Sequence, residues 1–204
     1  MFENLTTKLY KVQNNKYKLV ISPLFPGYGQ TFGNSLRRIM LSSIPGFAIT
    51  HIRINEITHE YQTINNVVED ALQVILNIKN IRAMIKTDVQ KATLTLMTSK
   101  DGDVTADLFE ETGDAVILNK DLYICHLNPG GKLKIEIDVE RGVGYRSADD
   151  LKMADNMDPF NMMVDAVFSP IYNVAMTVED TRVGDKTNYN KLILEFSTDG
   201  SVED

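Results

Sequence analysis

"GYGQTFGNSLRRIMLSS" spans residues 27–43, and its glycines decide how the rest of the chain is interpreted. Glycines let backbone N–H groups approach an anion, and a helix N-terminus carries partial positive charge, so a phosphate site is one interpretation. The spacing G-x-G-x-x-x-G misses the dinucleotide motif by one residue, and Asn34 stands where a phosphate-binding loop has lysine. The spacing therefore favours a second interpretation, in which Gly29 and Gly33 form the entrance of a helix.

A helical wheel of residues 32–43 predicts two different faces. One stripe, which packs inward or onto a second copy of the helix, contains Phe32, Leu36, Ile39, Met40 and Ser43. On the opposite side, Arg37, Leu41 and Arg38 follow one another at about 140°, 180° and 240° from Phe32. An exposed Arg-Leu-Arg triplet is typical of a docking patch, because arginine binds carboxylates in bidentate fashion. Two solvated arginines beside a peripheral leucine fit the wheel equally well.

Composition and charge limit the function classes. The 204 residues are 43% hydrophobic and carry a net charge of −7, which is ordinary for a globular protein. Residues 1–50 hold six basic side chains against Glu3 alone, and the remainder is acidic. An acidic chain is a poor nucleic-acid binder, so the local basic patch favours an acidic protein partner. The polar N-terminus and the lack of a long apolar run predict a cytoplasmic protein without membrane contact.

Alternation with period two predicts several strands, most regularly in KLKIEIDVE, residues 132–140. Weaker alternation occurs at 17–21, 47–57, 92–98, 115–119 and 122–127. NVAMTVEDTRV and KLILEFST flank GDKTNYN, which predicts a hairpin with a long loop.

Two further helices are expected. Residues 66–80 have a broad apolar face, with Asn66 as the N-cap and Glu69 in the capping-box position. A shorter helix is predicted at 158–168, with Pro159 in its first turn. Strands and helices do not alternate regularly, so the predicted class is α+β rather than a doubly wound parallel sheet.

The residue types that perform catalysis do not gather into a recognisable site. Cys125 and His126 are neighbours in a predicted strand and project to opposite faces, which argues against a nucleophile and base pair. His51 and His59 lack partners at zinc spacing, and the acidic stretch 101–114 does not follow a calcium loop. Four methionines near residue 160 are expected to fill a core or form an adaptable contact surface: Met153, Met157, Met162 and Met163. We predict no catalytic residue, metal or cofactor.

A resemblance adds to these patterns. The segments GYGQTFGNSLRRIMLSSIPGFAIT, HEY, VVEDALQVILNIKN, RGVGY, VDAVFSPI and VEDTRVGDKTNYNKLILEFSTDG occur in order along almost the whole chain. Together they resemble the N-terminal domain of the bacterial RNA polymerase alpha subunit. The resemblance implies a non-catalytic alpha subunit that dimerises and serves as the platform on which the beta and beta-prime subunits assemble in transcription. It is an enzyme only as part of DNA-directed RNA polymerase, a nucleotidyltransferase.

The family's fold implies a discontinuous dimerisation domain, residues 1–47 and 169–204, with a mainly β domain, residues 48–168, inserted between the two parts. Beta-subunit docking carries over to Arg37, Arg38 and Leu41. The dimer-facing stripe carries over to Phe32, Leu36 and Ile39.

The chain departs from the family pattern at Phe25-Pro26, at Asn188-Tyr189-Asn190 and from Arg146 to Asp158. The family continues beyond STDGSVED into a further dimer helix and a DNA-contacting C-terminal domain. The resemblance therefore implies contact with DNA only through the assembled complex or that further domain. A nucleotide-binding enzyme and a direct nucleic-acid binder are the competing hypotheses.

Overall fold

The computed structural model describes residues 5–55, 57–154 and 160–202. Its contacts divide the chain into two compact units. The terminal unit combines the residues up to Ile44 with those from Ser169 onward, and the insert unit runs from Pro45 to Phe168. The first division lies between Ile44 and Pro45, whereas the sequence placed it after residue 47.

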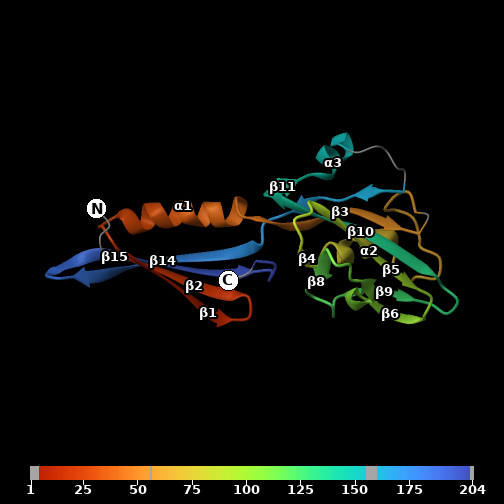
Figure 1. Ribbon diagram of the computed structural model, residues 1–204, viewed down its shortest axis with the longest axis horizontal. Helices are drawn as coiled ribbons and strands as arrows, with labels where there is room; N and C mark the ends of the chain where they lie inside the picture. Colours follow the sequence, from red (N-terminus) through yellow and green to blue (C-terminus); the bar gives the residue numbers. More distant parts are fainter. Residues whose placement is uncertain (1–4, 56, 155–159, 203–204) are drawn as a thin grey trace. The chain divides into compact units, whose positions relative to one another are not determined.

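The terminal unit is an antiparallel sheet covered on one face by a helix (Figure 1). The strand order is β1-β2-β15-β14, so both ends of the chain contribute to one sheet. The elements are β1 (Thr6–Gln13), β2 (Lys16–Leu24), α1 (Tyr28–Ser42), β14 (Ile171–Val183) and β15 (Lys186–Thr198). The core between α1 and the sheet consists of Ile21, Leu24, Met40, Ile171, Val174, Leu192 and Leu194.

The predicted hairpin is present, but its loop is shorter than expected. β14 and β15 are joined through Gly184 and Asp185, and Val183 pairs with Lys186. Gly184 has a φ of 61°, a conformation that suits a tight turn between twisted strands. Residues 186–190 therefore belong to β15, and the prediction that they form a loop is wrong.

The insert unit is built around a sheet with the order β12-β3-β10-β5-β7. Its central strand β10 (Leu133–Val143) contains the KLKIEIDVE alternation, and Ile135, Ile137 and Val139 are buried in the core. The other strands of this sheet are β3 (Pro45–Ile54), β5 (Lys91–Thr98), β7 (Phe109–Glu110) and β12 (Met162–Met163). Three two-stranded sheets are formed by β4 (Ala83–Ile85) with β8 (Ala115–Ile117), β6 (Gly102–Thr105) with β9 (Tyr123–Leu127), and β11 (Tyr145–Arg146) with β13 (Ala166–Val167). A 3₁₀ turn, η1 (Ala106–Leu108), precedes β7. Strands predominate and the helices are few, which confirms the predicted α+β class.

The second helix starts later than predicted. α2 (Ala71–Ile78) has Asp70 as its N-cap, whose side chain accepts a hydrogen bond from the Gln73 N–H at 2.7 Å. Asn66, the predicted cap, lies outside the helix with a φ of 60°. Glu69 is not part of a capping box, because its carboxylate accepts hydrogen bonds from the Tyr123 hydroxyl and the His126 N–H.

The helix predicted at 158–168 is wrong for the residues that the structure describes, and residues 158 and 159 lie outside them. Met162 and Met163 form β12 against β3, and residues 166–167 form β13 against β11. Instead, a helix that the sequence did not predict, α3 (Ala148–Ala154), follows Ser147. The Ser147 hydroxyl accepts from the Asp150 N–H, and the Asp150 carboxylate accepts from the Ser147 N–H, so S-x-x-D was the missed capping signal.

Candidate subunit interface

Helix α1 begins four residues before the segment placed on the wheel. Gly27 is its N-cap, with a left-handed φ of 81° and no side chain to accept a hydrogen bond. The N–H groups of Gly27 and Gly29 instead donate to the Oδ1 atom of Asn190 on β15, at 2.9 and 3.2 Å. Gly29 thus lies in the first turn of the helix and Gly33 in the second, so the predicted entrance is wrong for Gly33.

The two helical glycines face the sheet. A Cβ atom added at Gly29 would lie 2.7 Å from Val178 Cγ1, and one added at Gly33 would lie 2.7 Å from Leu192 Cδ1 and collide with the Met176 sulfur. Both glycines are buried. Glycine therefore allows α1 to approach β14 and β15 closely. The N–H groups that a phosphate would need already have an acceptor in Asn190, which argues against the phosphate interpretation.

The inward face of α1 also includes two leucines that the docking and dimer assignments had used. Leu36, predicted to face a second copy, packs against the core of its own unit, as does Leu41, which the wheel placed outward. Arg37 is exposed in part, yet its Nε donates to the Val174 carbonyl on β14 at 3.1 Å. The outward placement of Leu41 is therefore wrong, whereas Arg37 is exposed as predicted.

The outward face of α1 is apolar along one stripe. Tyr28, Phe32 and Ile39 are 54%, 42% and 53% exposed, and their spacing of four and seven residues aligns them on one side of the helix. Arg38 is exposed beside this stripe, and within the described residues its guanidinium group makes no ion pair. We name Tyr28, Phe32 and Ile39 the outer stripe. The helix itself contains no acidic residue.

The remaining candidates for chemistry have structural partners. Burial, followed by the charge of Glu69, raises the pKa of the Cys125 thiol to about 12, so the thiol stays protonated and unreactive. His126 pairs with Asp103 at 2.7 Å, and His51 is hydrogen-bonded to the Thr50 hydroxyl at 2.8 Å.

The acidic stretch is distributed among separate contacts. Glu111 pairs with Lys120, and Asp114 accepts from Thr87. Across the described ranges, no group of three His, Cys, Asp or Glu side chains is arranged to hold a metal ion. Of the four methionines considered as a contact surface, Met162 is buried and Met163 partly so, while Met157 and the side chain of Met153 lie outside the described residues.

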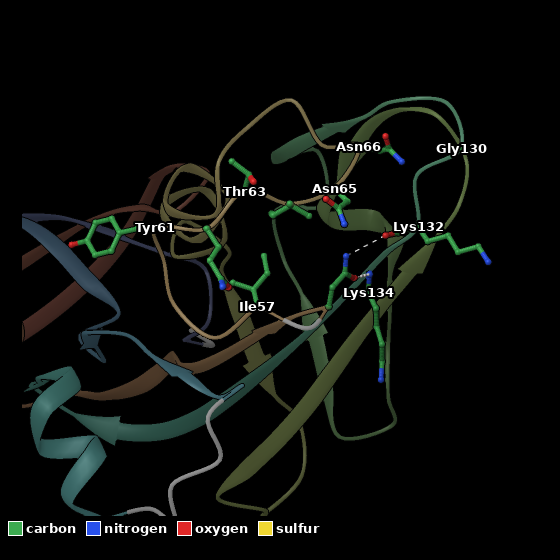
Figure 2. Close-up of a pocket in the computed structure, with 11 residues that line it drawn as sticks. Ile57, Tyr61, Thr63, Asn65, Asn66, Gly130, Lys132 and Lys134 are labelled. Carbon is green, nitrogen blue, oxygen red and sulfur yellow. Dashed lines mark hydrogen bonds between the residues drawn. The ribbon is translucent and has the colours of Figure 1, made fainter.

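A cavity with a volume of about 1010 Å³ lies in the insert unit (Figure 2). Its wall is formed mainly by amide and lysine side chains, and Asn55 bridges the Lys132 carbonyl and the Lys134 N–H at 3.2 and 2.7 Å. Among the described residues that line it there is no carboxylate and no histidine, so these residues supply no general acid and base pair. In the part of the chain that the structure describes, no helix is both long and apolar enough to cross a membrane.

Comparison with known proteins identifies the family of the insert unit and of the chain. Residues 52–169, more than half of the chain, match the RNA polymerase Rpb3/RpoA insert domain. The chain belongs to this family of RNA polymerase subunits, and the resemblance to the alpha subunit is confirmed.

Individual relatives carry the name DNA-directed RNA polymerase subunit alpha. The protein of Symbiobacterium thermophilum is 46% identical over 192 residues, which cover 93% of this chain and 60% of that protein. The proteins of Oenococcus oeni and Thermus thermophilus are 42% and 43% identical over 201 and 194 residues, covering 98% and 94% of this chain and 64% and 61% of theirs. The chain therefore spans about three fifths of the length of these relatives.

Proposed function

We propose that this chain is a non-catalytic assembly subunit of a cytoplasmic DNA-directed RNA polymerase. It forms a homodimer through the terminal unit, and the dimer is the platform for the beta and beta-prime subunits. The names of the relatives support this function, as does the lack of an acid and base pair among the described residues around the cavity in the insert unit. DNA is contacted only through the assembled complex or through a further domain of the full-length relatives.

The observation that carries the proposal is the outer stripe of α1. The opposite side of this helix already packs against β14 and β15, so the stripe is not needed for the core of the terminal unit. Contiguous exposed apolar residues on a folded helix are typical of a protein interface. We propose that Phe32 and Ile39 contact the same stripe of a second copy, because a two-fold dimer brings identical patches together. Leu36 supports this contact from inside its own unit.

Arg38 is the main residue in the proposed docking of the beta subunit. It is exposed on a helix without acidic residues, and a guanidinium group can bind a partner carboxylate through two parallel hydrogen bonds. Arg37 and Leu41 act with it indirectly, because their contacts with β14 and the core hold this part of the helix in place.

Substitution of the stripe tests the proposal. We expect the wild-type chain to sediment as a dimer, and the Phe32→Glu/Ile39→Glu variant to sediment as a folded monomer, because it places four like charges at the two-fold contact. Met97→Glu, which changes a similarly exposed apolar residue in the insert unit, should remain dimeric. Co-expression with a beta subunit should recover a complex with the wild-type chain and with Met97→Glu.

Two outcomes would contradict the proposal. A stripe variant that dimerises as tightly as the wild type excludes this face as the interface. A rise in melting temperature with nucleoside triphosphates would favour the nucleotide-binding enzyme instead, because a ligand that binds only the folded state stabilises it.

A further inference from the structure

The N-terminus of α1 depends on a residue from the other end of the chain. The first N–H groups of a helix have no partner within the helix and need another acceptor. Gly27 has no side chain to supply one, and no local residue caps the helix through its side chain. The acceptor is Asn190, whose Oδ1 binds the N–H groups of both Gly27 and Gly29.

Asn190 is itself held in place by its neighbours. It is only 8% exposed, and its Nδ2 donates to the Oδ1 atom of Asp180, its direct cross-strand partner on β14, at 3.4 Å. The Asp180 carboxylate can only accept, so it fixes the amide with Nδ2 toward β14 and Oδ1 toward the helix. Gly29 completes the arrangement, because a Cβ atom there would approach the Asn190 Cβ to 3.0 Å. The beginning of α1 is thus connected to both long strands.

The outer stripe begins at this connection. Tyr28 lies between the two anchored glycines, and Phe32 lies one turn later. Any rotation or lifting of the first turn therefore moves the aromatic half of the stripe. The C-terminal half has separate contacts, through Arg37 with Val174 and through the buried Met40. Loss of the N-terminal anchor would therefore affect the aromatic half most.

We propose that Asn190 is a positioning residue for the dimer interface, which fixes the first turn of α1 and so presents Tyr28 and Phe32 to the second copy. This inference rests on the proposed function. The side chain at position 190 must accept hydrogen bonds from the helix, and the side chains at positions 180 and 190 must form one hydrogen bond with each other. Either of the two positions can supply the amide, provided that the other supplies the carboxylate.

An exchange of the two side chains tests this requirement. Asn190→Ala removes the acceptor, and the double variant Asp180→Asn/Asn190→Asp moves the carboxylate to the helix N-terminus while keeping one amide donor across the strands. Asn188→Ala is the matched control, because Asn188 is an exposed asparagine on the same strand. For each protein, hydrogen exchange of the Gly27 and Gly29 amides and the dimer dissociation constant are measured.

We expect Asn190→Ala to weaken dimerisation about tenfold and to speed amide exchange at Gly27 and Gly29 by a similar factor, as for loss of an N-cap. The exchanged double variant and Asn188→Ala should both stay within about threefold of the wild type, since a threefold change corresponds to less than 1 kcal/mol. Rescue by the exchange distinguishes positioning from a general loss of stability, and it remains informative if Asn190→Ala does not fold.

The inference is overturned if Asn190→Ala dimerises within threefold of the wild type, or if the exchanged variant folds but dimerises as weakly as Asn190→Ala. If the wild type is dimeric and Asn190→Ala has the same dimer dissociation constant, only the positioning role is contradicted. A wild type that is monomeric at every concentration contradicts the proposed function, and the coupling to Asn190 with it.

Discussion

The two units bury their apolar side chains to different extents. In the insert unit, the core draws on almost every element, and large side chains such as Ile52, Leu94 and Ile137 are fully buried. In the terminal unit, the core is confined to the side of the sheet under α1, and every residue of β1 is exposed. An apolar cavity of about 220 Å³, lined in part by Tyr17, Met40 and Phe196, lies within that unit.

The polar groups show the same contrast. On the face of the insert sheet opposite its core, Asp138 is 2% exposed and is paired with Arg53 and Lys91 at 3.3 and 3.0 Å. On α1, Arg38 and the apolar stripe face outward. Asp138 is thus paired within the insert unit, whereas Arg38 and the outer stripe remain exposed on the terminal unit. Substitutions in the two units should therefore have different signatures, and four of them test the contrast.

The largest effect is expected at Asp138 in the insert unit. Asp138→Asn should destabilise this unit by about 3 kcal/mol at neutral pH, because Arg53 and Lys91 would face a neutral group and the Thr93 hydroxyl would lose a charged acceptor. The dimer dissociation constant should not change. Denaturant unfolding followed by a probe in the insert unit measures the loss, and Asp149→Ala, which removes an exposed carboxylate, should change stability by less than about 0.5 kcal/mol.

The difference in stability between the wild type and Asp138→Asn should depend on pH. Burial alone would raise the pKa of Asp138, but the hydrogen bonds from Thr93 and Lys91, with the charge of Arg53, hold the pKa below its ordinary value. A depressed pKa contributes stability that is complete above the unfolded value of about 4 and is lost as pH falls through the folded value. The difference between wild type and Asp138→Asn should therefore narrow below about pH 4. A constant difference down to pH 2 would exclude the ionised carboxylate as its source.

A smaller effect is expected at Gly33 in the terminal unit. Gly33→Val should destabilise this unit by about 1–3 kcal/mol, because the added carbons meet Met176 and Leu192. It should also weaken dimerisation, since α1 must move away from the sheet. Gly113→Val is the control, because an added Cβ at that exposed glycine meets nothing within 4 Å. Sedimentation and thermal unfolding of both variants give the two effects, and a Gly33→Val dimer of wild-type affinity would contradict the close approach.

The smallest effects on stability are expected at Arg37 and Arg38, and they should differ between the two residues. Arg37→Ala loses the hydrogen bond to the Val174 carbonyl and should cost about 1 kcal/mol of stability. Arg38→Ala should change stability by less than about 0.5 kcal/mol and yet weaken capture of the beta subunit about 30-fold, as for a hot spot worth about 2 kcal/mol. Equal stability losses in the two variants, or full capture by Arg38→Ala, would contradict the assignment of their roles.

Sequence patterns predicted the strands better than the orientation of α1. Alternation in residues 132–140 is directly visible because one face of β10 is buried and the other is not. The wheel of α1 misplaced Leu41, because two of the three buried positions of the helix are Gly29 and Gly33. Glycine adds nothing to an apolar stripe, so the predicted inward face was centred too close to Phe32 and Ile39.

The remaining differences from prediction arise where the structure depends on pairing between segments distant in sequence. Residues 162–167 have the composition of a helix, but their backbone pairs with Ile52, His51 and residues 145–146, which are distant in sequence. The role of Asn190 was equally invisible, because it depends on contacts with Gly27 and Gly29 at the opposite end of the chain. Local propensity contains no information about such contacts. The cap of α3 is different, because the spacing of Ser147 and Asp150 in the sequence is enough to predict the start of a helix.

The shared sheet of the two chain ends has a consequence for synthesis on the ribosome. β2 is hydrogen-bonded to β15, so the terminal sheet cannot close until residues beyond 186 have left the exit tunnel. By then the whole insert unit has emerged, and domains generally fold as units while the chain is still being made. The sheet that supports α1 is therefore completed after the insert unit has emerged. The outer stripe reaches its final position only once β15 has been translated and has paired with β2.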